Sequence, residues 1–268
     1  MLSGMFQTAL LFETVWSTIK HGRGRVSVLK VIIIIPAYNE ESNIERVVEQ
    51  IVTKFPQYDY IIINDCSTDS TEQVCRRLNY NYLSLPVNLG IGGAVQCGYQ
   101  YAHENKYDIA VQLDGDGQHN PDYLELLIKP LQDNEADLVI GSRFIDKKGF
   151  QSSALRRFGI NIIRIVIRLC CGVKVTDATS GFRAANIGLI ELYSNEYAHD
   201  YPEPEAIVTA ALNGYRITEM PVVMNERLGG KTSINALRSI YYMLKVPLAL
   251  IVYRIGNKKQ KIAGGART

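Results

Sequence analysis

Residues 108–121 read Asp-Ile-Ala-Val-Gln-Leu-Asp-Gly-Asp-Gly-Gln-His-Asn-Pro, an apolar run that passes directly into two carboxylates separated by one residue. The run predicts a buried strand, and the glycines at 115 and 117 allow the backbone to turn sharply after it. Mg²⁺ and Mn²⁺ prefer oxygen ligands and keep positions open for phosphate oxygens. Asp114 and Asp116 could therefore hold a divalent cation and a ribose together, although a simple Asp-Gly turn between strands has the same pattern.

Around this stretch the chain alternates strands and helices from Lys30 onward. Apolar runs predict strands at 31–35, 60–63, 82–85, 109–113 and 137–140, with helices ending near 54, 78, 105 and 132. Such alternation predicts an α/β fold with a parallel sheet, whose ligands bind at the carboxyl ends of the strands. Polar clusters follow each of these strands. Asn39 or Ser42 is expected to cap the first helix.

The composition fits a globular domain. With 268 residues, 47% hydrophobic and 21% charged, the chain suits one large α/β domain or one domain with a small appendage. The 5 cysteines include no Cys-x-x-Cys pair and are expected to be reduced core thiols of a cytosolic protein. Basic residues cluster with isoleucines rather than with exposed aromatics, which argues against nucleic-acid binding.

The N-terminal residues do not show a clear role. Residues 1–29 are either a peripheral helix with a basic linker or an extension outside the fold. The segment 5–19 lacks a basic start and a small-residue cleavage site, so a signal peptide is not expected. No apolar stretch reaches the length of about 18 residues that a spanning helix needs.

A glycine-rich turn, Gly90-Ile-Gly-Gly-Ala-Val95, partly matches the dinucleotide-binding fingerprint. Val95 occupies the third glycine position, and the turn follows the third predicted strand rather than the first. We therefore expect a tight strand-to-helix connection that allows close packing, not a phosphate site.

A series of motifs along residues 30–235 carries a family resemblance. They are Ile35–Glu40, Asn64–Asp69, Asn88–Gly92, Asp114–His119, Gly141–Arg143, Asp177–Arg183 and Glu219–Gly230. Together they resemble the family 2 glycosyltransferases of the GT-A fold, and among them the dolichyl-phosphate mannose synthases and polyprenyl-phosphate glycosyltransferases. The resemblance implies a mostly parallel nucleotide-binding sheet flanked by helices over 30–235. A C-terminal amphipathic helix and basic tail are expected over 236–268.

The resemblance implies an inverting, metal-dependent transfer from a nucleotide-sugar donor, with Mg²⁺ or Mn²⁺ as cofactor. A metal and cationic side chains stabilise the charge that develops on the leaving diphosphate. The family's nucleoside pocket corresponds to Pro36, Tyr38, Glu40 and Asp65, and its diphosphate-binding arginine to Arg227. The implied metal ligands are Asp114, Asp116 and Gln118. Asp114 is also expected near the ribose, and Asp116 is expected to be catalytic.

Some of these residues have structural alternatives. Glu40 could simply complement the dipole of the following helix. Asp65 could form a turn with Ser67 and Thr68. Asp69 is expected to cap a helix rather than to bind a ligand.

On the acceptor side, Arg143 is expected to face the reaction centre and to bind an acceptor phosphate bidentately. Arg156 and Arg157 are candidates for a second phosphate-binding arginine, or else solvated surface charges. Arg183 either pairs with Asp177 to fix a loop or contacts substrate. The chain reads Gly230-Lys-Thr-Ser233 where the synthase branch carries Gly-x-Ser-Lys, and Lys231 could replace that lysine.

The need for a catalytic base depends on the acceptor. A sugar hydroxyl needs a base, whereas an ionised phosphate does not. Asp200, Glu203 or Glu205 could serve as the base. Glu205 matches a glutamate of the synthase branch, and orienting the loop that carries Arg183 is the preferred role for it.

Many relatives append transmembrane helices, whereas this chain ends soon after Ile255, so membrane access is expected to be peripheral or supplied by a partner protein. Residues 158–170 place isoleucines beside a basic face of Arg157, Arg164 and Arg168, and residues 236–255 form a second apolar stripe that Pro247 is expected to kink or break. Such helices suit the headgroup boundary of an anionic membrane. The alternative is that both pack on the sheet or on a second subunit.

The expected function is therefore transfer of a sugar to a polyprenyl phosphate such as undecaprenyl phosphate, at the cytosolic face of the membrane. Two alternatives stay open: extension of a lipid-linked or cell-wall polysaccharide at a sugar hydroxyl, and a non-catalytic sugar-nucleotide-binding subunit. The sequence does not determine the nucleotide base, the sugar, the acceptor or the oligomeric state.

Overall fold

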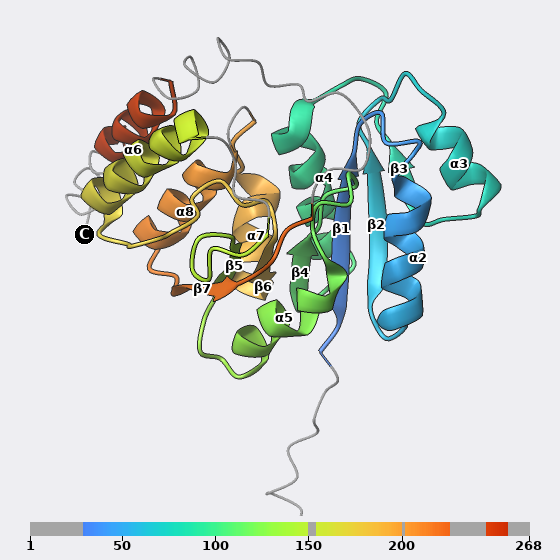
Figure 1. The fold of residues 1–268 in the computed structure, drawn as a ribbon, viewed down its shortest axis with the longest axis horizontal. Helices are drawn as coiled ribbons and strands as arrows, with labels where there is room; N and C mark the ends of the chain where they lie inside the picture. Colours follow the sequence, from blue (N-terminus) through green and yellow to red (C-terminus); the bar gives the residue numbers. More distant parts are fainter. Residues whose placement is uncertain (1–28, 150–153, 200–201, 226–244, 257–268) are drawn as a thin grey trace, which may run out of the picture.

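The computed structural model describes residues 29–149, 154–199, 202–225 and 245–256, with side chains from 157 onward in the second range. Its centre is a single sheet of seven strands in the order β3-β2-β1-β4-β6-β5-β7 (Figure 1). The strands are β1 (Val31–Ala37), β2 (Asp59–Asn64), β3 (Tyr82–Ser84), β4 (Ile109–Gln112), β5 (Leu138–Ser142), β6 (Arg183–Asn186) and β7 (Ile217–Pro221).

Most strand pairs are parallel, as the alternation predicts. β1 pairs in parallel with β2 and β4, and β5 with β7, whereas β6 runs antiparallel between β4 and β5. Ile32–Ile35 in the central strand β1 are completely buried, because helices cover both faces of the sheet. β6 (Arg-Ala-Ala-Asn) and β7 (Ile-Thr-Glu-Met-Pro) carry no apolar run, so the hydrophobic pattern does not predict them as strands.

The helices form two layers. One apolar cluster joins the sheet to α2 (Ile44–Lys54), α3 (Thr71–Arg77), α5 (Leu124–Gln132) and the short 3₁₀ turn Pro121–Tyr123 that precedes α5. The other cluster contains α4 (Gly90–Glu104), α6 (Ala154–Cys171), α7 (Ile187–Asn195), α8 (Pro202–Leu212) and the helical residues 245–256. Among the described residues, no helix has the length and apolarity needed to span a bilayer.

Residues 245–256 belong to the core of the domain. Val246 and Leu250 are completely buried, and the Cys170 Sγ of α6 lies 3.8 Å from the Leu250 carbonyl oxygen. Figure 1 shows this helix beside α6. Pro247 does not interrupt the helical residues. Part of the segment expected to be a C-terminal amphipathic helix thus packs with the second helical layer.

The predicted cap of α2 is wrong. The helix begins after Asn43, whose side chain makes no capping hydrogen bond. The Asn39 Oδ1 instead accepts the N–H of Thr68 at 2.8 Å, which ties the loop after β1 to the loop after β2. Ser70, not Asp69, is the N-cap residue of α3, but the Asp69 carboxylate accepts the N–H of Thr71 at the start of that helix at 2.9 Å.

The glycine-rich turn allows close packing, as expected. Gly90 has a φ of +75°, a conformation that side chains disfavour. A Cβ on Gly92 would collide with the backbone carbonyls of Ala198 and His199, so α4 can approach that segment only because residue 92 is glycine. All five cysteines are free thiols, two of them buried and three partly buried.

Candidate active site

The predicted site residues follow three neighbouring strands, β2, β1 and β4, whose carboxyl ends meet at one edge of the sheet. Backbone hydrogen bonds join these ends. The Gly115 N–H donates to the Pro36 carbonyl at 3.2 Å, and the Asp65 N–H donates to the Ala37 carbonyl at 2.9 Å. The structure therefore brings the expected nucleoside residues beside the loop that carries Asp114 and Asp116.

Tyr38 and Glu40 differ in exposure. Tyr38 is 47% exposed, so its ring offers an open apolar surface beside this edge. Glu40 is buried, and its Oε2 accepts a hydrogen bond from the Asn43 Nδ2 at 2.8 Å. Its own N–H donates to the Thr71 Oγ1 at 2.9 Å. These contacts place a carboxylate at the start of α2, where it complements the helix dipole.

Asp65 is buried at the start of α4 rather than in a local turn. Its Oδ1 accepts the N–H of Leu89 at 2.7 Å, whereas Ser67 donates to the side chain of Asn64. The expected alternative, a turn of Asp65 with Ser67 and Thr68, is therefore wrong. Burial raises the pKa of Asp65, and hydrogen bonds from the N–H groups of Leu89 and Gly90 partly oppose that rise.

The carboxylate pair follows β4 and is partly buried. The Asp114 Oδ1 accepts from the Gln112 Nε2 at 3.2 Å, and the Asp114 N–H donates to the His119 Nδ1 at 3.0 Å. The His119 ring stacks on Phe182, with ring centroids 5.0 Å apart. Asp116 accepts the N–H of Gln118 at 2.9 Å. Hydrogen bonds and stacking thus hold both sides of the loop.

Gly181, two residues before β6, lies against the side chains of Gln112 and Asp114. A Cβ on Gly181 would lie 2.9 Å from the Gln112 Nε2 and 3.1 Å from the Asp114 Oδ2. Such a separation is shorter than a normal contact, so a larger residue would displace the carboxylate. Glycine at position 181 therefore allows the backbone to cover Asp114 closely.

The pair fits a cation that draws most ligands from a substrate. No group of three His, Cys, Asp or Glu residues suited to a metal occurs within the described ranges. Mg²⁺ is commonly held by one or two carboxylates together with substrate phosphates and water, so two aspartates are sufficient. The Gln118 carbonyl accepts the N–H of Asn225 at 2.9 Å, which leaves the side-chain amide as its candidate ligand.

Asn225 also marks where the expected donor-phosphate segment begins. Its hydrogen bond to Gln118 brings the chain beside the loop of the carboxylate pair, two residues before Arg227. Arg227 and Lys231 lie outside the described residues, as do Asp200 and the side chain of Arg156.

Arg143 follows β5 and is held by a buried ion pair. Its Nε lies 2.6 Å from the Asp177 Oδ2 and its Nη2 lies 2.8 Å from the Asp177 Oδ1, while Nη2 also donates to the Thr179 Oγ1 at 3.0 Å. Burial alone would lower the pKa of Arg143. Hydrogen bonding and charge attraction from Asp177, with smaller contributions from Asp114 and Glu203, raise it overall. The guanidinium is therefore charged and fixed in one orientation.

The loop that carries Asp177 is itself anchored by β7. The Glu219 carboxylate accepts the N–H of Thr176 at 2.6 Å and the N–H of Asp177 at 2.8 Å. Burial raises the pKa of Glu219, and these two hydrogen bonds partly oppose the rise. The Thr176 hydroxyl also lies 2.6 Å from the Ser142 hydroxyl on β5. Hydrogen bonds to Glu219 and Ser142 thus hold Thr176 and Asp177 in place.

Arg183 does not pair with Asp177, which corrects that expectation. It is completely buried and donates to the Ser180 carbonyl at 2.6 Å and to the Glu203 carbonyl at 3.1 Å. It therefore connects β6 to the first turn of α8 through the backbone. Glu203 and Glu205 lie in that turn and are partly exposed. Arg157 is exposed on α6.

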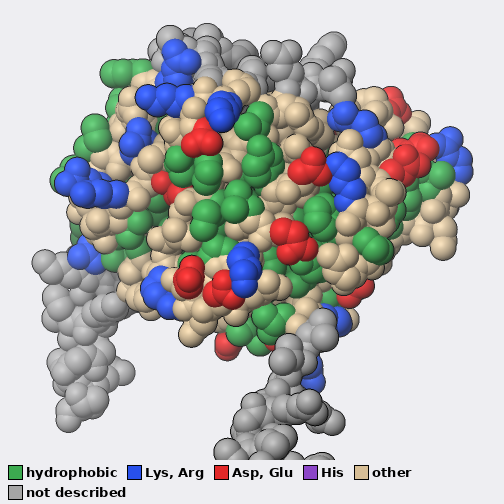
Figure 2. Space-filling view, turned by 60° about the horizontal axis from the view of Figure 1, so that its bottom comes forward, with side chains coloured by type: hydrophobic (Ala, Val, Ile, Leu, Met, Phe, Trp, Pro, Cys, Tyr) green, Lys and Arg blue, Asp and Glu red, His purple; other side chains and the backbone are tan. Residues whose placement is uncertain are grey.

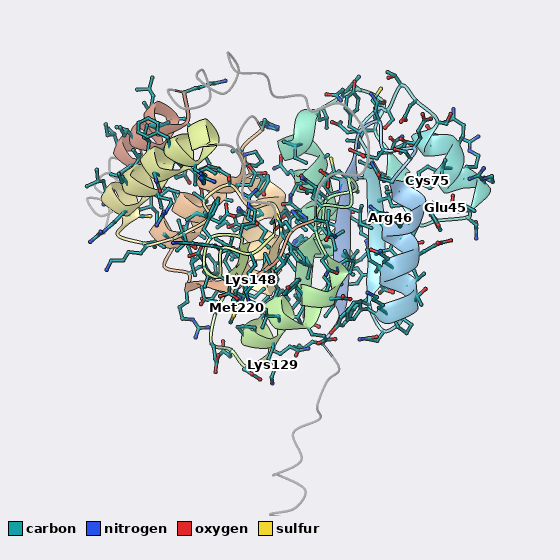
Figure 3. The ribbon with its side chains drawn as sticks, in the orientation of Figure 1. Glu45, Arg46, Cys75, Lys129, Lys148 and Met220 are labelled. Atoms are coloured by element: carbon teal, nitrogen blue, oxygen red, sulfur yellow. The ribbon has the colours of Figure 1, made fainter. Side chains whose placement is uncertain are left out.

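Three site features were missed by sequence reasoning. The partner of Asp177 is Arg143, and the anchor of its loop is Glu219; both residues stood in the quoted motifs, but spacing alone does not pair them. The third is Arg46 on α2, which is labelled in Figure 3. Its guanidinium lies so close to Gly117 that a Cβ at position 117 would collide with it. A basic residue in the first two turns of a helix gives no sequence signal of such a contact.

The profile described as "Glycosyl transferase family 2" matches residues 32–192. The chain belongs to this family and is a family 2 glycosyltransferase.

Two curated relatives are similar over most of their length. The UDP-N-acetylglucosamine–dolichyl-phosphate N-acetylglucosaminyltransferase of Methanococcus voltae is 33% identical over 211 residues, which cover 71% of this chain and 83% of that protein. The undecaprenyl-phosphate mannosyltransferase of Micrococcus luteus is 28% identical over 219 residues, covering 77% and 88%. Both names specify a polyprenol-type phosphate as the acceptor.

The fold matches solved structures. Glucosyl-3-phosphoglycerate synthase from Mycobacterium tuberculosis with phosphoglyceric acid has a TM-score of 0.66 and 22% identity, covering 86% of this chain and 81% of that chain. The same enzyme with Mn²⁺, UDP and glucosyl-3-phosphoglycerate has a TM-score of 0.64 at the same identity and coverage. The expected GT-A fold, with a mostly parallel mixed sheet flanked by helices, is thereby confirmed.

Proposed function

We propose that the protein is a metal-dependent, inverting glycosyltransferase that moves a sugar from a nucleotide-sugar to a polyprenyl phosphate. The carboxylate pair Asp114 and Asp116 carries the proposal, because it is partly buried where the ends of β1, β2 and β4 meet. The acceptors in the names of the two relatives support a lipid phosphate.

On the donor side, Pro36, Tyr38, Glu40 and Asp65 would hold the nucleoside, with the exposed Tyr38 ring as an apolar surface. Asp114 would contact the ribose. Mg²⁺ or Mn²⁺, held by Asp114, Asp116 and the Gln118 amide, would supply positive charge to the leaving diphosphate. Arg227 would add a second positive charge there, since the chain reaches residue 225 beside Gln118.

On the acceptor side, a phosphate oxygen would attack the anomeric carbon from the face opposite the leaving group. The bond between that carbon and the diphosphate oxygen breaks, the leaving nucleoside diphosphate takes the electron pair, and the configuration inverts. An ionised phosphate has no proton to lose, so no base is required. Arg143 would orient the phosphate with a guanidinium that Asp177 already holds in place, and Arg156 or Arg157 would assist.

One observation favours a second candidate, transfer to a sugar hydroxyl of a lipid-linked or cell-wall glycan. Glu203 lies close enough to Arg143 to contribute to its raised pKa, so a carboxylate is within electrostatic reach of the acceptor side. Glu203 or Glu205 would then act as the base that removes the hydroxyl proton.

A surface for the lipid lies on α6 and the helical residues 245–256, which we call the apolar–basic face. Its exposed apolar side chains are Phe158, Ile165 and Leu169 on α6, and Leu248, Val252 and Ile255 on the second helix. Their spacings of three, four or seven residues place each set on one side of its helix. Exposed basic residues accompany them at Arg157, Arg168 and Arg254.

The charge of this face suits anionic lipid. α6 carries no Asp or Glu. Figure 2 shows Lys and Arg side chains gathered among hydrophobic ones at the left of the view, on the side where α6 lies in Figure 1. Apolar side chains flanked by arginines are typical of surfaces that enter the headgroup region. We therefore propose peripheral binding at the cytoplasmic face of the membrane.

A turnover panel tests the proposed reaction. The purified protein would be incubated with Mg²⁺ or Mn²⁺ and UDP-, GDP- or dTDP-sugars, with and without undecaprenyl phosphate. We expect lipid-linked product from one donor, and none after EDTA. Product on an added glycan, but not on undecaprenyl phosphate, would replace the proposal with the hydroxyl acceptor.

Co-sedimentation tests the membrane surface. Leu169 is 80% exposed, so Leu169→Glu should leave folding intact. We expect this variant to bind phosphatidylglycerol vesicles more weakly than the wild type does, whereas Leu126→Glu, an exposed change on α5, should bind normally. Equal binding by both variants would argue against the apolar–basic face.

A further inference from the structure

The orientation of Arg143 depends on a loop that has little regular structure of its own. Residues 176–179 lie between α6 and β6, outside any helix or strand. Asp177, in this loop, is completely buried and provides both oxygens to the Arg143 guanidinium, 34 residues away in the sequence. The position of the Asp177 backbone therefore decides where the guanidinium points.

Glu219 holds that backbone. Its two carboxylate oxygens accept different N–H groups, Oε2 that of Thr176 and Oε1 that of Asp177. A carboxylate can accept on both oxygens, whereas an amide side chain offers only one acceptor oxygen and places donors at the other position. Glu219 is partly buried, so the loss of one of these hydrogen bonds would be poorly compensated by water.

The same strand continues toward the carboxylate pair. After Glu219, β7 ends at Pro221, and the Val222 N–H donates to the Ser142 carbonyl at 3.0 Å. The chain then reaches Asn225, which is hydrogen-bonded to Gln118. Figure 3 labels Met220, the residue that follows Glu219, on this flank of the sheet. β7 and residues 222–225 thus contact both the loop that carries Asp177 and the loop that carries Asp116.

We propose that Glu219 is a positioning residue for the acceptor side of the reaction. By holding the N–H groups of Thr176 and Asp177, it fixes the Asp177 carboxylate and, through it, the Arg143 guanidinium. Glu219 does not touch the acceptor itself. The inference rests on the proposed function in one respect, the assignment of the acceptor phosphate to Arg143.

A resonance of Arg143 reports the positioning directly. The Nε–H signal in a ¹H–¹⁵N spectrum would be assigned by its loss in Arg143→Lys. We expect Glu219→Gln to shift or broaden this signal. Glu196→Gln is the matched control, because its exposed carboxylate accepts a surface hydrogen bond from the Tyr253 hydroxyl at 2.8 Å and should leave the signal unchanged. An unchanged Arg143 signal in Glu219→Gln would overturn the proposal.

Kinetics test the consequence. We expect Glu219→Gln to raise the KM for undecaprenyl phosphate about tenfold while the KM for the donor stays within about twofold. In an Asp177→Asn background the same change should have little further effect, because it acts through Asp177. The same fold-change in both backgrounds, or an equal rise of both KM values, would contradict the positioning role. If Glu219→Gln does not fold, Glu219→Asp replaces it, since the shorter carboxylate cannot reach both N–H groups.

The two proposals can fail separately. If the wild type transfers no sugar to undecaprenyl phosphate, the proposed function fails, and the Arg143 signal alone then decides the role of Glu219. If transfer occurs and the signal does not respond to Glu219→Gln, the proposed function stands and the positioning role is rejected.

Discussion

The donor flank of the site comprises the connections that follow β1, β2 and β4, and the acceptor flank comprises Arg143, residues 176–179 and Glu219. The two flanks are held in place differently. On the donor flank, polar side chains bind the backbone or the side chains of the adjacent strand-to-helix connection, as Asp65 does at the start of α4 and Asn39 does at Thr68. On the acceptor flank, Arg143 depends on Asp177, and Asp177 on Glu219, through segments 34 and 42 residues apart.

The difference predicts different responses to substitution. Donor-flank residues are held by hydrogen bonds to the neighbouring connection, as in Asp65 and Asn39, so a change there should affect binding or chemistry more than folding. The acceptor flank contains a buried charge pair, and removal of one partner leaves the other uncompensated. A change there should therefore affect stability as well as acceptor binding.

The largest effect on activity is expected on the donor flank. Asp116→Ala removes one oxygen ligand of the proposed metal and should lower kcat by about 10³-fold. The melting temperature should stay near that of the wild type, because Asp116 is partly exposed. Asp122→Ala, an exposed change just before α5, is the control. Retained activity in Asp116→Ala would contradict the role of the carboxylate pair.

The largest effect on stability is expected on the acceptor flank. Asp177→Ala removes the carboxylate that forms the buried ion pair with Arg143 and should lower the free energy of unfolding by about 3–5 kcal/mol. Urea titration followed by circular dichroism would measure this change. Asp133→Ala removes an exposed pair with Lys129 and should change stability very little. Similar losses in both variants would show that the two pairs do not differ as proposed.

Gly181 connects the two flanks, because it lies in the segment that follows the Asp177 loop but contacts Asp114 on the donor flank. Gly181→Ala should displace Asp114 and weaken Mn²⁺ binding about tenfold, the size of effect typical of residues behind a metal ligand. Titration of Mn²⁺ followed by electron paramagnetic resonance would measure the affinity. Gly256→Ala, where a Cβ meets no atom within 4 Å, is the control. Unchanged Mn²⁺ affinity in Gly181→Ala would argue that Asp114 does not bind the metal.

The smallest effect concerns the edge pairing of β5 and β7. Hydrogen bonds from Arg216 to Asp137, just before these strands, lower the pKa of Asp137 despite partial burial. A lowered pKa contributes stability above the unfolded value of 3.8, and the contribution is lost as pH falls through the lowered value. Asp137→Asn should therefore lower the melting temperature slightly at pH 7, with a smaller difference at pH 3. A difference that grew toward acidic pH would have the wrong sign.

The same comparison explains what the sequence could predict. The donor flank consists of apolar strands, each followed by a polar cluster and a helix, and this pattern alone predicts that Asp65, Asp114 and Asp116 lie at one edge of the sheet. The acceptor flank contains β6 and β7, which are short and carry few apolar residues. β6 is also antiparallel, and simple alternation does not predict such an insertion.

Partner choice was beyond sequence reasoning for a physical reason. Asp177 lies within six residues of Arg183, yet it pairs with Arg143, because the loop turns toward β5 while Arg183 is buried against Ser180 and α8. Similarly, the caps of α2 and α4 depend on how neighbouring connections pack. Motifs therefore predicted the candidate site residues, whereas the contacts of these residues required the three-dimensional structure.

The most direct test of the central claim compares acceptors. Transfer from the active nucleotide-sugar would be measured with undecaprenyl phosphate and with undecaprenol in identical vesicles, using wild type and Asp116→Ala. The account predicts lipid-linked product only with undecaprenyl phosphate and only with the wild type, because the phosphate is the nucleophile and the carboxylate pair supports the leaving group. Equal transfer to undecaprenol, or product from Asp116→Ala at the wild-type rate, would contradict it.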